Sequence, residues 1–382
     1  MPEQNSEHTN VVKTSFLERF GLYYFEIFKK YNPKKKAFIL SDSELAKKVK
    51  SITNKGMIYS AIIGIICVYP TVWVDVTLTD EPFIKHYGWV AIVTIISIII
   101  EIYILFLISL KAVYEVSKLI NLHAKEESFE KDGVFSVKHI LARTALELPD
   151  PELKILGVDP FKQISKKNLL VLSLLYKAKI LITNKFLYFF LLFAFGKYIF
   201  GISILYEALI VECFWNCVVI HRVVLEARLR LFGFAIANQI GNNVIDSNVL
   251  DKLSPMAELG CLRAIGNAVV MTQNYHPNMI VLLLRFQEIL KINTEEKIDD
   301  WNIFLETLQK CTEEERNFLL DLFTVSAAFD GKLSDLELEN LESAYGKDYN
   351  LYFERLKLLT RYMKEGKLNA AIASSKLDFV AG

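Results

Sequence analysis

Ionisable and amide side chains inside apolar runs are the residues of this chain most able to do chemistry. Glu101 is the single Asp, Glu, Lys or Arg between Lys85 and Lys111. In a second apolar block, 186–220, the acidic and amide side chains are Glu207, Glu212 and Asn216. An ionisable group inside a membrane is costly and usually faces protein or water. These residues could therefore form an ion or proton relay, but groups that hydrogen-bond neighbouring helices are the interpretation we favour.

A second set of candidate ligands follows helical spacing. Cys213, Cys217 and His221 are four residues apart, which would place all three on one helix face. Small residues packed in a membrane helix are the interpretation we favour. The chain has no Walker A sequence, no Rossmann glycine fingerprint, no His-Glu-x-x-His, no Cys-x-x-Cys and no Gly-x-Ser-x-Gly. We therefore expect no catalytic activity.

Uncharged stretches predict a membrane protein. Between Lys55 and Asp75 there is no charged side chain, and such a run is long enough to cross a hydrocarbon core about 30 Å thick. We expect a first transmembrane hairpin over 56–112 and a second over 186–225. The alternative places only the first hairpin in the membrane. Five scattered cysteines, an odd number, favour free thiols over a disulfide framework.

Charge distribution predicts the orientation. Residues 1–56 contain eleven Lys or Arg against six Asp or Glu, whereas 294–382 contain eleven against eighteen. Cations flank the predicted spans, but the loop 77–87 has only Lys85. This pattern predicts a multi-pass protein of the cell membrane with both termini in the cytoplasm. A basic front end suits anionic lipids. The acidic tail excludes nucleic acid as its partner and suits a basic protein surface or a divalent cation.

The predicted fold is all-α, because no stretch alternates as a strand would. Capping boxes begin helices at Ser41, Thr312 and Ser334. Gly346 ends the helix that Ser334 begins, and Gly366 ends a further amphipathic helix over about 349–365. The amphipathic stretch 11–31 either lies in the membrane interface or packs on the protein. The predicted regions are 1–55 (amphipathic and basic helices), 56–112 (first hairpin), 113–185 (cytoplasmic helices), 186–225 (second hairpin), 226–293 (cytoplasmic helices) and 294–382 (acidic helical domain).

The last region contains LDLFTVSAAFDG at 320–331, followed by KLSDLE at 332–337. This segment resembles the TerB-like helical domain associated with tellurite resistance, which also occurs in DjlA-type membrane co-chaperones. The resemblance implies a helical domain in which acidic residues beside the turn bind a metal. By position, this role would fall to Asp330 and Glu337, and a divalent metal is the only cofactor we expect. Glu337 is equally explained as the partner in a capping box.

A second resemblance rests on Leu-Pro-Asp-Pro at 148–151, Phe-Trp-Asn at 214–216, the arginines after 221 and Tyr-His-Pro-Asn at 275–278. Together these segments look like an uncharacterised family of bacterial membrane proteins. The resemblance supports the predicted membrane topology and does not indicate an activity.

The functional expectation is a membrane-anchored scaffold, or a sensor of stress or of an ion, acting through its cytoplasmic helical tail. The alternative is a transporter or channel that uses the intramembrane carboxylates. Four spans form a pathway most readily by oligomerising, so that alternative implies a homo-oligomer.

Overall fold

All the secondary structure in the described part of the chain is helical, which confirms the all-α prediction. The computed structural model describes residues 15–31, 40–120, 136–146, 148, 204–246, 249–272, 276–292 and 297–377. The α-helices are α1 Phe16–Tyr31, α2 Asp42–Thr77, α3 Phe83–Leu119, α4 Val137–Ala145, α6 Ile204–Asp246, α7 Pro255–Thr272, α8 Pro277–Leu290, α9 Trp301–Lys310, α10 Glu313–Ala327, α11 Asp335–Tyr345, α12 Tyr349–Glu365 and α13 Leu368–Ser374. Three short 3-10 turns complete them: η4 Leu250–Lys252, η5 Ala328–Asp330 and η6 Gly346–Asp348.

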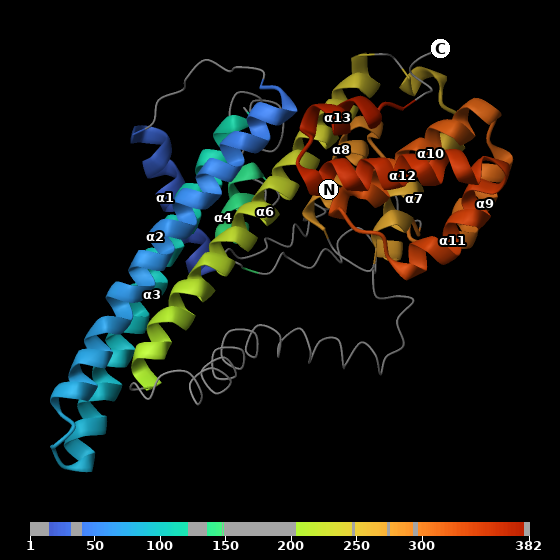
Figure 1. The fold of residues 1–382 in the computed structure, drawn as a ribbon. Helices are drawn as coiled ribbons and strands as arrows, with labels where there is room; N and C mark the ends of the chain where they lie inside the picture. Colours follow the sequence, from blue (N-terminus) through green and yellow to red (C-terminus); the bar gives the residue numbers. More distant parts are fainter. Residues whose placement is uncertain are drawn as a thin grey trace, which may run out of the picture.

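Helices α2 and α3 form a long hairpin that reaches away from the C-terminal helices (Figure 1). The capping box begins α2 as predicted: the Ser41 amide donates to Glu44 Oε2 over 3.0 Å, and the Glu44 amide donates to Ser41 Oγ over 3.4 Å. The helix then continues through Pro70. Both α2 and α3 are long and apolar enough to cross a membrane. The predicted boundaries of the first hairpin, after residues 55 and 112, fall inside the continuous helices α2 and α3.

Exposed apolar side chains form a band on this hairpin, which we call the apolar band. On α2 it extends from Ile58 to Val76, and on α3 from Phe83 to Tyr103. At 1.5 Å per residue each stretch is about 27–30 Å long, the thickness of a bilayer core. Exposed aromatic rings lie toward both ends of the band, as in membrane proteins. They are Tyr59 and Tyr103 toward one end, and Trp73, Tyr87 and Trp89 toward the other.

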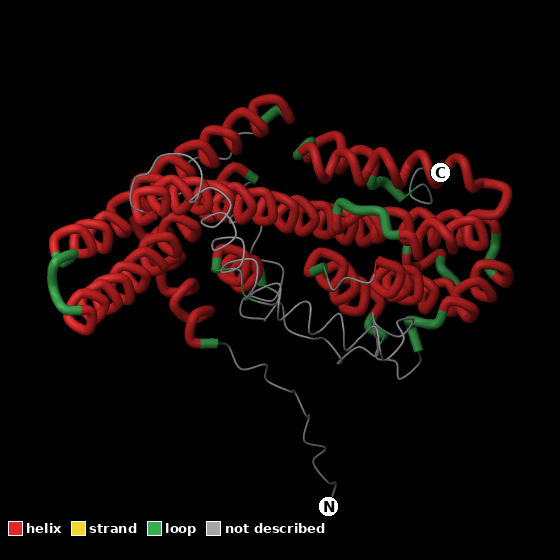
Figure 2. Tube along the Cα trace, turned by 60° about the horizontal axis from the view of Figure 1, so that its bottom comes forward, coloured by secondary structure: helices red, strands yellow, loops and turns green. Residues whose placement is uncertain are grey.

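Helix α6 joins the two parts of the molecule. It has 43 residues and is therefore about 65 Å long. Its first part packs on α2 and α3, and its last part packs on α8 (Figures 1 and 2). The sequence predicted a membrane hairpin over 186–225 and cytoplasmic helices from 226, and the structure has one continuous helix through this boundary. Residues 186–203 lie outside the described part, so the first half of the predicted second hairpin stays a prediction.

The C-terminal helices share one hydrophobic core with α7 and α8. An added Cβ at Gly260 would lie 2.8 Å from Leu319 of α10, so α7 and α10 are in close contact. Helices before and after residue 293 are therefore packed together. The capping box at Thr312 forms as predicted. Gly366 ends α12 in the left-handed conformation, with φ 81°, which only glycine adopts readily.

The N-terminal helices attach to the rest of the molecule through polar contacts. The Asp42 carboxylate accepts hydrogen bonds from the amides of Asn369 (2.8 Å) and Ala370 (3.1 Å), which ties the start of α2 to α13. Helix α1 packs on α3 and α4. One face of α1 is buried at Gly21 and Phe25, but Phe16 is 82% exposed on the other. The sequence left open whether this stretch lies in the membrane interface or packs on the protein. The buried face of α1 packs on the protein.

Candidate functional site

Three helices bring polar side chains together inside the apolar hairpin bundle, and we call this group the polar cluster. Asn216 of α6 donates through Nδ2 to Glu101 Oε1 of α3 over 2.6 Å and to the Ser60 carbonyl of α2 over 3.4 Å. The Glu212 carboxyl, one helical turn before Asn216 on α6, lies close to the Glu101 carboxyl. Glu101 is 6% exposed and Asn216 is 1% exposed. Glu101 and Asn216 therefore link α3 to α6 through a buried hydrogen bond.

The polar cluster lies toward one end of the apolar band. Ser60 follows Tyr59, and Glu101 precedes Tyr103 by two residues, so the cluster is close to the end that carries these two tyrosines. A polar group near the membrane surface costs less than one at the midplane. Gly64 makes room for the amide, because an added Cβ there would lie 2.7 Å from Asn216 Nδ2.

Chemically, the polar cluster combines two carboxyl groups and one amide. The side chain of Glu207, the fourth residue predicted for this set, lies outside the described residues.

The cysteines of the same helix are placed differently. Cys217 donates its thiol to the Met57 carbonyl of α2 over 3.5 Å, whereas His221 is exposed. Among the side chains that the structure describes, no three His, Cys, Asp or Glu residues are arranged to hold a metal ion. The contact of Cys217 supports the packing interpretation for this part of the face.

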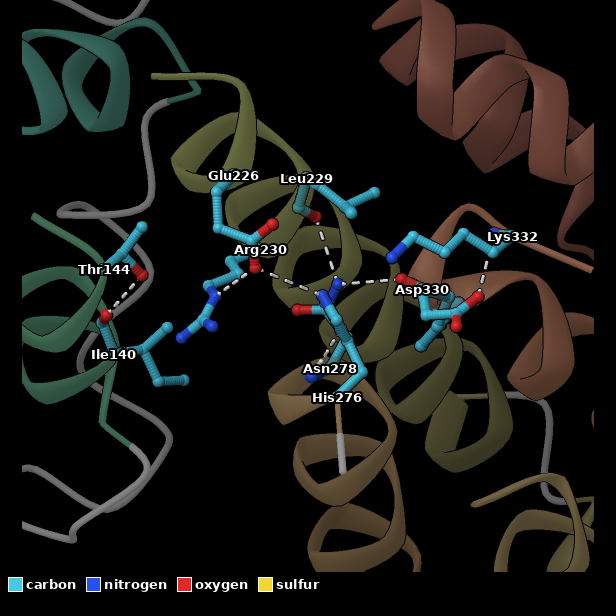
Figure 3. A network of polar contacts seen from close by, with 10 residues as sticks. Ile140, Thr144, Glu226, Leu229, Arg230, His276, Asn278, Asp330 and Lys332 are labelled. Carbon is cyan, nitrogen blue, oxygen red and sulfur yellow. Dashed lines mark hydrogen bonds and ion pairs between the residues drawn. The ribbon is translucent and has the colours of Figure 1, made fainter. Parts of the chain in front are cut away.

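A second polar group lies further along α6, where it meets α8 and η5 (Figure 3). We call it the α6–α8 joint. Asn278 is fully buried and donates through Nδ2 to the carbonyls of Leu229 (3.1 Å) and Phe329 (3.2 Å). One side chain thereby links α6 to the end of the α10–η5 segment. An added Cβ at Gly233 would lie 2.0 Å from the same Nδ2, so the joint needs glycine there.

His276 and Glu226 form the other side of the α6–α8 joint. His276 Nδ1 accepts from the Asn278 amide over 3.4 Å and so caps α8, while Nε2 lies 3.7 Å from Glu226 Oε1. Arg230 Nε donates to the same Oε1 over 2.7 Å. Burial disfavours the charged form of Glu226, but His276 and the charge of Arg230 outweigh it and hold the Glu226 pKa well below its usual range. The carboxylate therefore stays charged in the folded protein.

Asp330, predicted as a metal ligand, lies beside this joint. It is buried, and its Oδ1 accepts from the Lys332 amide over 2.9 Å, which closes the turn after η5. The side chain of its predicted partner, Glu337, lies outside the described residues. The Ser334 hydroxyl donates to the Met271 carbonyl of α7 over 2.7 Å. The metal prediction therefore stays a prediction, while Asp330 has a structural role in the turn.

A buried ion pair was missed at the sequence level. Glu18 of α1 accepts from Arg143 Nη1 over 3.1 Å and lies 2.8 Å from His139 Nδ1, both on α4. Arg143 is 2% exposed. Because 125 positions separate Glu18 from Arg143, no local spacing could have indicated the pair. His276 did carry a signal, since a side chain before Pro277 stands where a helix N-cap belongs.

Comparison with known proteins gives no relative. No protein family, no curated protein and no solved structure matches the chain.

Proposed function

We propose that this protein is a multi-pass scaffold of the cell membrane that holds a cytoplasmic helical domain at a fixed position and presents it to a protein partner. One observation carries the proposal: α6 is a single helix from the polar cluster to the α6–α8 joint. A continuous helix transmits position and orientation, whereas a flexible linker would not. The role assigned is binding without catalysis. Stress or ion sensing by a TerB-like tail belongs to the same proposal.

The orientation is supported by the ends of the apolar band. The end with Tyr59 and Tyr103 continues into helices that carry exposed Lys55 and Lys111, and the C-terminal helices lie on that side. The opposite end, the α2–α3 loop, has Asp80 and Glu81 beside its single cation, Lys85. Cations accumulate on the cytoplasmic side of membrane proteins. This assigns the α7–α13 helices to the cytoplasm.

The surface offered to a partner is acidic. Helix α10 begins with exposed Glu313 and Glu314, and α11 carries exposed Glu339 and Glu342. Surface charges of one sign steer a partner of the opposite charge and suppress wrong partners. We therefore assign the scaffold a protein partner with a basic surface.

Neutralising this surface tests the scaffold. In intact membranes, the full chain with Glu313, Glu314, Glu339 and Glu342 changed to Gln should lose most of the proteins that a lysine-reactive cross-linker joins to the wild type. The matched control, Lys357→Gln with Arg361→Gln, changes exposed charges on α12 and should retain them. Cross-linked partners that do not differ between wild type and the glutamate variant would contradict the proposal.

The polar cluster favours a second candidate, an oligomeric transporter or channel. Buried carboxyl groups that meet between membrane helices are typical of proton and cation pathways. Against it, the cluster lies near one end of the apolar band, whereas transport sites lie near the midplane.

Ion flux distinguishes the two candidates. For the scaffold, liposomes containing the purified full chain should take up protons or sodium no faster than empty liposomes. The transporter candidate requires uptake above that background, abolished by Glu101→Gln because this change removes an ionisable group of the polar cluster. Glu81→Gln in the α2–α3 loop is the control and should have no effect on such uptake.

A further inference from the structure

We propose that the cations at one end of the apolar band form a collar that binds the head groups of anionic phospholipids. The collar consists of Lys55 on α2, His221 and Arg222 on α6, and Lys111 on α3. The inference rests on the proposed membrane location and goes beyond it, because it names the lipid class and the residues that recognise it.

The register of α2 and α6 places the first cations at one level. An added Cβ at Gly56 would lie 2.8 Å from the Ile220 side chain, and one at Gly64 would lie 3.5 Å from the Cys213 backbone nitrogen. The two helices are therefore antiparallel, with 56 beside 220 and 64 beside 213. Lys55 precedes the first of these contacts, and Arg222 follows it by two residues. Both are exposed, as is His221 between them.

Lys111 of helix α3 lies at a second level of the collar. Its Glu101 lies beside Asn216 of α6, and both helices run in the same direction from there. Lys111 is ten residues after Glu101, and Arg222 is six residues after Asn216. At 1.5 Å per residue, Lys111 lies about 6 Å further from the apolar band than Arg222. The collar thus has the depth of a head-group layer, which adds roughly 5–8 Å to each side of the hydrocarbon core.

The neighbouring surface identifies the occupant as lipid. The collar begins within one helical turn of exposed Ile58 and Tyr59, so it continues directly from the apolar band. Long cationic side chains at such a boundary extend toward phosphate groups. The other end of the hairpin differs, because the carboxylates Asp75 and Glu81 lie there beside His86 and Lys85. An anionic head group is therefore favoured at the collar and not at the α2–α3 loop.

Lipid retention tests the collar. The full chain is purified from vesicles of phosphatidylcholine and phosphatidylglycerol in equal amounts, and the lipids that stay bound are counted by native mass spectrometry. Wild type should retain severalfold more phosphatidylglycerol than phosphatidylcholine. The preference should disappear in Lys55→Gln with Arg222→Gln, and it should survive in the charge-conserving Lys55→Arg with Arg222→Lys. Lys357→Gln with Arg361→Gln, the same charge change on α12, should leave it intact.

The outcomes separate the collar from the proposed function. Equal retention of both lipids by wild type, or a preference that survives the Lys55 and Arg222 glutamine changes, would overturn the collar. Release of the protein from membranes by alkaline carbonate would overturn the membrane location itself. A protein that stays in the membrane without preferring phosphatidylglycerol keeps its proposed location and loses only the collar.

Discussion

Replacing Gly233 with alanine is expected to destabilise the protein by about 3 kcal/mol, although alanine is the better helix former. The added Cβ would lie 2.0 Å from Asn278 Nδ2, which cannot move without losing its bonds to Leu229 and Phe329. The carbonyls of Leu229 and Phe329 would then lose the hydrogen bonds that this amide donates. Urea unfolding of the full chain in mild detergent, followed by helical circular dichroism, measures the loss.

Two controls make this prediction specific. Gly88 is an exposed helical glycine with nothing within 4 Å of an added Cβ, so Gly88→Ala should be neutral or slightly stabilising. In a background that already carries Asn278→Ala, Gly233→Ala should cost much less, because the atom it displaces is gone. If Gly233→Ala lowers the free energy of unfolding by the same amount in both backgrounds, the close approach of Gly233 and Asn278 is not the cause of the loss.

Removing the arginine of the α1–α4 ion pair is the second large effect. Arg143→Met leaves the buried Glu18 carboxylate with His139 as its remaining partner. Breaking a buried pair by removing one member costs about 3–5 kcal/mol. Because the pair joins α1 to α4, the loss should be local. Amide hydrogen exchange in α1 should accelerate strongly, while exchange in α10 stays close to that of the wild type.

A double variant distinguishes lost pairing from lost packing. Glu18→Leu with Arg143→Met replaces both charges with apolar side chains of similar size. Exchanging a buried pair for apolar groups is often neutral or stabilising. Protection of α1 should therefore return to near the wild-type level. If the double variant exchanges as fast as Arg143→Met alone, the buried charge left on Glu18 is not the cause of the loss.

Local chemistry made several helix ends predictable. The capping boxes at Ser41 and Thr312 and the left-handed glycine at 366 involve residues within one turn of each other, so their spacing is sufficient to find them. The uncharged runs likewise indicated α2 and α3. The full extent of α6 was not predictable in this way, because no local signal marks residue 246 as its end. The last part of α6 packs on α8, which only the tertiary fold brings there.

The same difference between local and long-range contacts applies to the polar groups. Sequence alone indicated that Glu101, Glu212 and Asn216 are polar residues in apolar surroundings, and the structure adds that they meet each other. The sequence could not indicate that Glu226 meets His276, or that Glu18 meets Arg143. The partners in each pair lie on different helices, which only the tertiary fold brings together. Pro277 is a residue typical of a first helical turn, which marks the histidine before it as the start of α8. The second ring nitrogen of His276 faces Glu226 of α6 only once α8 is packed there.

The hydrogen bonds between Asp42 and the start of α13 have a consequence for the order of synthesis. The Asp42 carboxylate and the Asn369 amide are 327 positions apart. At about 5–20 residues per second, a ribosome makes α13 roughly 15 to 65 s after the start of α2. The hairpin must therefore form and persist without this contact. Its closure is among the last events of folding and can occur only on a chain that has been made almost to its end.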